Sequence, residues 1–234
     1  MINFSVPWLP LTRAAIIILS ALLAWVTYRS HLLLKHYQPE FNLLLAPPEF
    51  VMRLVLVGLC LLLAWLSGLP AGQLGLMVKI PVQTIGLGVT IGAVVALLVN
   101  FLSYWSIKHF GRHIYSPLVI RNILPRHPTE WGLVAVAFLP AVAMEELLFR
   151  TLWLGGFSDI VPLWLLILGT SILFGLMHQP QGQLGVIMAG GINIFFSILF
   201  VWSGQLLLPL TAHYVVNVLQ LVMAHFQREQ LEKF

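Results

Sequence analysis

Charged side chains are scarce in this sequence. Only 9% of its 234 residues are Asp, Glu, Lys or Arg, whereas about a quarter of the residues in soluble globular domains are charged. Hydrophobic residues make up 59% of the chain. Because so few charged groups cannot form the polar shell of a water-soluble domain, the composition excludes an ordinary soluble globule and indicates a surface that faces lipid.

Cysteine is almost absent, and basic runs with interleaved aromatic residues are missing. The single cysteine, Cys60, lies within an apolar run, which excludes an intrachain disulfide and disfavours cysteine chemistry. The missing basic runs argue against a nucleic-acid partner. The excess of 12 Lys and Arg over 8 Asp and Glu instead indicates contact with anionic lipid headgroups.

Seven apolar runs approach the roughly 20 residues that a membrane-spanning helix needs. We therefore predict an all-α, polytopic transmembrane helix bundle of about seven spans, located in the cell membrane if the source is bacterial. No small-residue cleavage site follows the first run, so it is interpreted as a retained anchor. The predicted spans are Leu11–Tyr28, Phe50–Leu69, Gln83–Ile107, Trp131–Leu154, Val161–Met177, Leu184–Trp202 and Gln205–Phe226.

The polar loops predict how the bundle is oriented. The longest insert, Lys108 to Glu130 before the fourth span, mixes arginines with apolar residues and is predicted to lie along the membrane interface. If seven spans alternate, nine basic residues gather on one face, here called the basic face, and two, Arg13 and Lys79, on the opposite face. Lys and Arg are enriched in cytoplasmic loops, so we expect the basic face in the cytoplasm and the N-terminus outside. The nine residues are Arg29, Lys35, Arg53, Lys108, Arg112, Arg121, Arg126, Arg228 and Lys233.

The fourth span contains three ionisable residues, Glu145, Glu146 and Arg150. Each ionised side chain in the middle of a membrane helix costs on the order of 2.5 to 3.5 kcal/mol, so the three must be paired or functional. Glu146 and Arg150 are four residues apart and share a helix face, which predicts an ion pair between them. A buried ion pair that fixes helix register explains this pair but leaves Glu145 free to face another neighbour.

The fifth and seventh spans supply further polar side chains. Phe174 and His178 are one turn apart at the end of the fifth span, and His213 and Asn217 share a face of the seventh. Taken alone, His178 is more typical of an interfacial or capping residue, and the polar pair could serve as interhelical hydrogen bonding. Asn193 in the sixth span has the same default interpretation.

Together these side chains have the chemistry of amide hydrolysis. A glutamate beside a histidine can position and deprotonate a water molecule, and a histidine with an asparagine amide can donate hydrogen bonds to an oxyanion. No serine or cysteine lies in a recognisable nucleophile motif, so water activation is favoured over an acyl-enzyme.

Three motifs in this order, EELLFR, FGLMH and HYVVN, resemble those of the CPBP family, the CAAX-protease and bacteriocin-processing intramembrane proteases also called the ABI family. The resemblance covers roughly Trp131 to Gln220. It implies that Glu145 and His178 hold the attacking water and that His213 and Asn217 stabilise the oxyanion. It also implies that Glu146 and Arg150 support the first pair, with Phe174 in its motif beside them. The chain then divides into N-terminal helices and interfacial loop (1–130), a catalytic helix core (131–226) and a polar tail (227–234).

The resemblance leaves the cofactor and the activity open. Glu145, His178 and His213 could form a zinc site with water as the fourth ligand, but an HExxH motif is absent and a metal-free mechanism is preferred. The expected partners are a peptide or protein substrate and the lipid bilayer. The alternatives are a non-catalytic immunity or peptide-binding protein on the same fold and a proton-coupled transporter, although no matched pair of broken helices supports the transporter.

Helix counting raises a problem of depth. Straight helices place Glu145 and His213 about 12 Å from the opposite face and His178 roughly 10 Å deeper. We therefore predict that the fourth span breaks at Gly155 and Gly156, inside the membrane, so that the fifth begins deeper. The same count opens the site towards the opposite face, whereas eukaryotic family members trim prenylated CAAX proteins at the cytoplasmic side.

Overall fold

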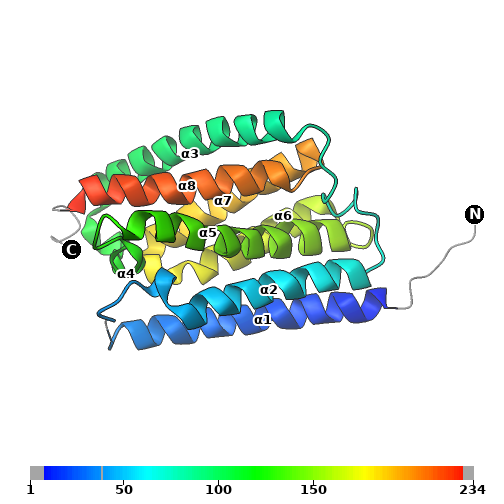
Figure 1. The fold of residues 1–234 in the computed structure, drawn as a ribbon, viewed down its shortest axis with the longest axis horizontal. Helices are drawn as coiled ribbons and strands as arrows, with labels where there is room; N and C mark the ends of the chain where they lie inside the picture. Colours follow the sequence, from blue (N-terminus) through cyan, green and yellow to red (C-terminus); the bar gives the residue numbers. More distant parts are fainter. Residues whose placement is uncertain (1–7, 38, 229–234) are drawn as a thin grey trace, which may run out of the picture.

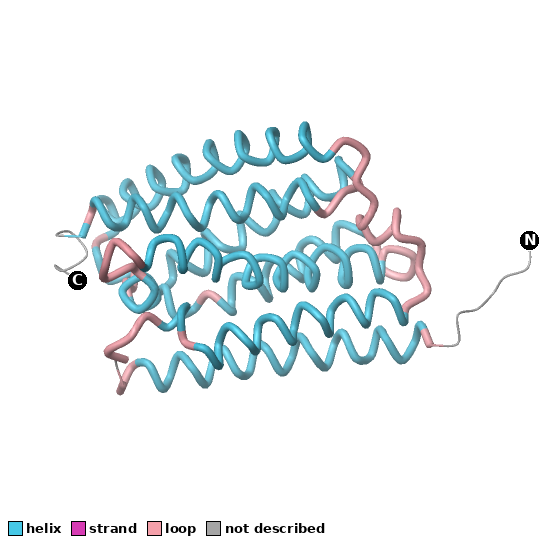
Figure 2. Tube along the Cα trace, in the orientation of Figure 1, coloured by secondary structure: helices cyan, strands magenta, loops and turns pink. Residues whose placement is uncertain are grey.

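The computed structural model describes residues 8–37 and 39–228, which form a bundle of long helices lying side by side (Figure 1). Within these residues there is no strand, and most of the loop segments lie at the two ends of the bundle (Figure 2). The predicted all-α helix bundle is confirmed. The helices are α1 (Leu9–Leu34), α2 (Pro47–Leu66), α3 (Pro81–Phe110), α4 (Leu118–Ile123), α5 (Glu130–Glu146), α6 (Leu163–Met177), α7 (Gly182–Ser203) and α8 (Leu207–Phe226), with short turns η1 (Leu43–Leu45), η2 (Arg112–Ile114) and η4 (Gln179–Gln181) and a π-helix, η3 (Leu147–Gly155).

Six helices in the described part of the chain are long and apolar enough to cross a membrane, so the protein is an integral, multi-pass membrane protein. They coincide with six of the seven predicted spans. The fifth predicted span is present as α6, but its 15 residues are fewer than a full crossing needs. Its helix still runs antiparallel to its neighbours α5 and α7, so the predicted alternation of the chain is retained (Figure 1).

The polar insert between α3 and α5 folds against one end of the bundle. It forms η2 and α4, and Ile120 and Ile123 of α4 pack on the cluster around Leu44 and Phe138. This is the end where α2 and α5 begin and α3 and α8 finish (Figure 1), and it carries the basic face. The predicted tail is described only as far as Arg228, so residues 229–234, including Lys233, lie outside the described residues.

Two helix pairs are held close by glycines. A Cβ on Gly92 of α3 would lie 2.5 Å from the carbonyl oxygen of Ala212 in α8, and a Cβ on Gly175 of α6 would lie 2.7 Å from the carbonyl oxygen of Val186 in α7. Only glycine permits such backbone approach. The α8 helix, which carries His213, and the α6 helix, which His178 directly follows, are thereby fixed against α3 and α7.

The predicted break at Gly155 and Gly156 is wrong. The fourth helix passes from α5 into η3 directly after Glu146 and continues through both glycines before the chain turns. The glycines serve close packing instead, because a Cβ on Gly155 would lie 2.9 Å from the carbonyl oxygen of Gln73. Arg13 Nε donates to the carbonyl oxygen of Gly156 at 2.9 Å, which anchors α1 to this segment. A π-helix is rare and is often found at functional sites.

Candidate active site

Glu146 and Arg150 form a buried ion pair. Arg150 Nη1 donates to Glu146 Oε1 at 3.0 Å, and both side chains are completely buried. Arg150 Nη2 also donates to the backbone carbonyl of Asn193 in α7 at 3.3 Å. The predicted i, i+4 pair is therefore confirmed. It also ties the α5–η3 helix to α7, because the guanidinium group bonds to both.

His213 lies between the two adjacent glutamates. Its Nδ1 is 2.7 Å from Glu146 Oε1, and its Nε2 is 3.6 Å from Glu145 Oε2. Since a carboxylate accepts hydrogen bonds, Nδ1 carries a proton and donates a hydrogen bond to Glu146. Glu146 therefore contacts His213, a partner that the sequence did not indicate. The side chain of Glu145 is 26% exposed whereas that of Glu146 is fully buried, so Glu145 is the acid that faces the cavity.

His178 folds back along its own helix. It follows the last residue of α6, and its Nδ1 lies 2.8 Å from the carbonyl oxygen of Phe174, one turn earlier. Its ring packs on that of Phe174 with centroids 4.4 Å apart, and the Phe174 ring also contacts the ring of His213 at 6.2 Å. The His178 side chain therefore lies against the last turn of α6.

A cavity of about 910 Å³ joins these groups. Glu145, Phe174, His178, His213 and Asn217 all line it, so the structure brings five predicted site residues to one space. Glu146 and Arg150 are buried behind them. Asn193 lies outside the lining, and its Nδ2 donates to Ser171 Oγ of α6 at 2.9 Å, as expected for interhelical hydrogen bonding.

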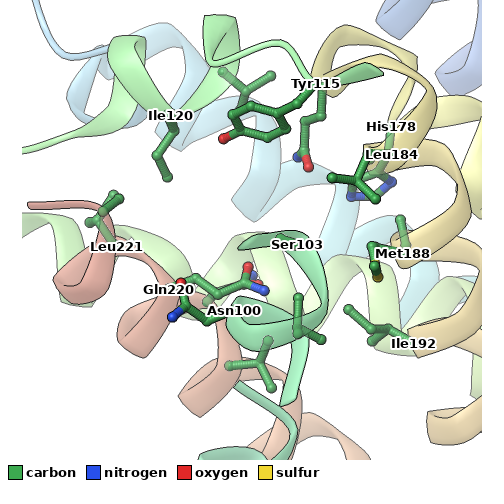
Figure 3. A pocket seen from close by; sticks show the side chains of 18 of the residues that line it. Asn100, Ser103, Tyr115, Ile120, His178, Leu184, Met188, Ile192, Gln220 and Leu221 are labelled. Atoms are coloured by element: carbon green, nitrogen blue, oxygen red, sulfur yellow. The ribbon is translucent and has the colours of Figure 1, made fainter. Parts of the chain in front are cut away.

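Part of the cavity wall was not predicted from the sequence. Asn100 and Ser103 of α3 and Gln220 of α8 line the cavity across from Leu184, Met188 and Ile192 of α7 (Figure 3). Arg53 of α2 also lines it. In this chain the helix faces that line the cavity are largely apolar, as are the faces that meet lipid, so the sequence does not distinguish them. Only the scattered Asn, Ser and Gln residues could have indicated the cavity wall.

The cavity leads to the basic face. Along α8 its lining continues from His213 through Asn217 and Gln220 to Gln227, a distance of about 21 Å at 1.5 Å per residue. Lys108, near the end of α3, and Arg112, the first residue of η2, line the same cavity. The expectation that the site opens towards the opposite face is therefore wrong, because helix counting gave depth but not the side of the helices on which space is left.

The residues do not form a preformed metal site. In residues 8–37 and 39–228 no three His, Cys, Asp or Glu side chains are grouped closely enough to hold an ion. Glu145, His178 and His213 as they lie therefore do not fit the three-ligand shell considered for zinc.

Part of the chain that contains this site matches a known protein family. Residues 127–219 match the family described as type II CAAX prenyl endopeptidase Rce1-like. The resemblance to the CAAX-protease family is confirmed. The Rce1-like segment, residues 127–219, contains all three motifs and spans most of α5 to α8. At the level of the family, the match supports a CAAX-protease-like intramembrane endopeptidase. Such an enzyme acts on a peptide substrate and lies in a lipid bilayer.

A second comparison extends beyond the Rce1-like segment. The chain is 25% identical over 144 residues to the uncharacterized protein YpbD of Bacillus subtilis (strain 168), an alignment that covers 61% of this chain and 71% of that protein. No solved structure gives a significant match. Arg53, Asn100, Ser103 and Lys108 line the cavity from outside the Rce1-like segment.

Proposed function

We propose that the protein is an intramembrane endopeptidase that hydrolyses peptide bonds with a water molecule activated by Glu145 and His178. The observation that carries the proposal is the placement of Glu145, His178, His213 and Asn217 around the inner part of one cavity. Many of the residues that line the cavity are apolar, among them Phe138, Phe174 and Leu184, and an apolar wall strengthens electrostatic interactions beside it.

Glu145 and His178 activate the water molecule. The Nδ1–H of His178 donates to the carbonyl oxygen of Phe174, which leaves Nε2 as the acceptor of the ring. A water molecule can then donate one hydrogen bond to His178 Nε2 and the other to the Glu145 carboxylate. Glu145 removes its proton as the water oxygen attacks the carbonyl carbon of the substrate.

His213 and Asn217 stabilise the oxyanion. Because Nδ1–H of His213 donates to Glu146, Nε2 can donate to the substrate only when the ring carries both protons. In that form His213 Nε2–H and the Asn217 amide provide two donors for the developing oxyanion. The C–N bond then breaks and Glu145 returns its proton to the leaving amine, so that one water is consumed and an acid and an amine are formed.

The carboxylate of Glu145 provides the test. The protein would be reconstituted in phospholipid vesicles and assayed with quenched fluorogenic peptides, with and without a farnesylated cysteine. Since a general base contributes about 10²- to 10⁴-fold, Glu145→Gln is expected to lower kcat by that amount while the protein still folds. Glu130→Gln is the matched control, because Glu130 begins the same helix outside the cavity lining.

The same experiment distinguishes a protease from the alternative, a non-catalytic binding protein. If a peptide binds to the wild type and to Glu145→Gln with equal affinity and is cleaved by neither, the protein binds peptides without hydrolysing them. Cleavage that is unchanged in Glu145→Gln overturns the assignment of Glu145.

A further inference from the structure

A second cavity, of about 620 Å³, lies on the other side of the start of α7. In this helix Leu184 and Met188 line the catalytic cavity, whereas Gln183 and Ile187 line the second one. The two cavities have no described lining residue in common. Leu176 and Ile187 are exposed apolar residues in its wall. The second cavity is therefore a separate site that opens onto the outer surface of the bundle.

The polar part of this wall lies at the end of the bundle that carries the basic face. His31, in the last turn of α1, and Lys35, which follows that helix, both line the cavity. Ser116, Gln179 and Gln183 add neutral polar side chains, and none of the described lining residues is acidic. The cavity therefore presents positive charge at the level where lipid headgroups lie.

His31 has a hydrogen-bonding group that no described residue satisfies. The residue is only 8% exposed, and its Nδ1 is buried without a hydrogen-bond partner among the described residues. A buried polar group without a partner is costly. Lys35 is four residues further and shares the face of α1 that meets the cavity. A ligand with anionic oxygens would supply a hydrogen-bond acceptor to His31 and a countercharge to Lys35.

The start of α7 adds backbone donors to the same wall. Gly182 and Gln183, the first residues of this helix, line the cavity, and no described side chain caps the helix. The first turn of a helix has free N–H groups and the positive end of the helix dipole, which favour phosphate. Gly182 has a φ of +82°, and a Cβ there would lie 2.7 Å from the carbonyl oxygen of Ile114. The Ser116 amide donates to the carbonyl oxygen of Gln181 at 3.0 Å. These contacts hold the Ser116 loop against the helix start.

The wall becomes apolar towards the middle of the bundle. Leu176 of α6 and Val186 and Ile187 of α7 line this part. Ile187 lies one turn inside Gln183, about 6 Å along the helix axis. The cavity thus has a cationic end at the membrane surface and an apolar wall beneath it, an arrangement that matches the headgroup and the acyl chain of a phospholipid.

We propose that this cavity binds an anionic phospholipid from the leaflet at the basic face. His31, Lys35 and the start of α7 bind the phosphate group, and Leu176 and Ile187 contact an acyl chain. Basic pockets between transmembrane helices on the cytoplasmic side recognise anionic headgroups in this way. A zwitterionic headgroup brings its own cation next to Lys35 and binds less well. The site is distinct from the proposed protease centre, and its occupancy does not require hydrolysis.

Thermal unfolding of the full chain in a non-ionic detergent tests the proposal. A ligand that binds only the folded protein raises the unfolding midpoint in a concentration-dependent way, which gives an apparent Kd. The ligands are dioleoyl phosphatidylglycerol, dioleoyl phosphatidylcholine with the same acyl chains, and inorganic phosphate. We expect phosphatidylglycerol to bind about fivefold or more tightly than either of the others. Equal stabilisation by phosphatidylcholine would show that charge is not recognised, and equal stabilisation by inorganic phosphate would assign the site to a soluble anion. Either result overturns the proposal.

Variants assign the response to this cavity. Lys35→Gln is expected to bind phosphatidylglycerol about fivefold more weakly, because one basic residue near the membrane surface contributes about this factor. Lys35 is exposed, so its substitution should leave the fold intact. His31→Phe, which keeps a ring but removes both nitrogens, should also weaken binding.

Arg29→Gln is the matched control. Arg29 is an exposed basic residue of α1, two positions before His31, and does not line the cavity. We expect Arg29→Gln to keep the affinity of the wild type. An equal loss in Arg29→Gln and Lys35→Gln would show general attraction to a charged surface, and an unchanged affinity in Lys35→Gln would place the lipid elsewhere. Both results contradict the proposed site.

Discussion

His213 Nδ1 lies 2.7 Å from Glu146 Oε1, and the same oxygen accepts the hydrogen bond from Arg150 Nη1 at 3.0 Å. This relationship gives the two adjacent glutamates different roles. Glu146 is buried and holds an arginine and a histidine, whereas Glu145 faces the cavity. The resemblance implied that Glu146 and Arg150 support Glu145 and His178; their direct hydrogen bonds instead reach His213 and the backbone of α7.

Removing the charge of Glu146 should destabilise the fold. Glu146→Gln leaves the charge of Arg150 buried without its partner, and breaking a buried pair costs about 3 to 5 kcal/mol. We expect a clearly lower midpoint of thermal unfolding in detergent, whereas Glu145→Gln, at a partly exposed position, stays close to the wild type. Equal effects of the two substitutions would contradict the separate roles of these glutamates.

Asn217 should contribute to the rate and much less to binding. It lines the cavity one turn from His213, where its amide can reach an oxyanion formed near the histidine. Loss of one such donor costs about 10²- to 10³-fold in kcat, so Asn217→Ala is expected to lower kcat by that factor with little change in KM. A variant with raised KM and normal kcat would place Asn217 in substrate binding instead.

The contact of α3 with α8 should be sensitive to one methyl group. A Cβ on Gly92 would lie 2.5 Å from the carbonyl oxygen of Ala212 and 2.8 Å from Val215 Cβ. Overpacking of this kind costs about 1 to 3 kcal/mol, so Gly92→Ala should lower the unfolding midpoint. Gly86→Ala on the same helix meets nothing within 4 Å and should leave the midpoint unchanged or raise it, because alanine is the better helix former.

The orientation of the cavity can be measured with cysteine labelling. Cys60 is completely buried, and Cys60→Ala provides a cysteine-free background for Lys79→Cys and His127→Cys at opposite ends of the bundle. Because Lys and Arg mark the cytoplasmic side, an impermeant thiol reagent should label the Lys79→Cys protein in intact cells and the His127→Cys protein only after lysis. The reverse labelling pattern would show that the cavity opens towards the outside of the cell.

The sequence was sufficient for features that depend on local spacing. Apolar runs predicted the helices, and a separation of four residues predicted the Glu146–Arg150 pair, because both follow from the geometry of a single helix. It was also sufficient to select the polar side chains that now line one cavity, because ionisable and amide groups are costly in lipid and stand out against an apolar background.

Features that depend on packing between helices could not be predicted. The bond from His213 to Glu146 requires the relative rotation of α5 and α8, and the place of Arg53 in the wall requires α2 to lie beside α5. The glycines at 155 and 156 suggested a break, but Gly155 instead lets the helix approach residues 73 and 74 closely. In these cases a short sequence pattern is compatible with two structures, and tertiary contacts select one.

The central claim is that Glu145 and His178 act on one water molecule, and a double-mutant cycle on kcat tests it most directly. Glu145→Gln, His178→Ala and the double variant would be compared with the wild type in single-turnover cleavage of one peptide. Residues that act as a unit are strongly non-additive, so we predict that the double variant is scarcely slower than the slower single variant. Losses that multiply in the double variant would show independent action and contradict a shared water.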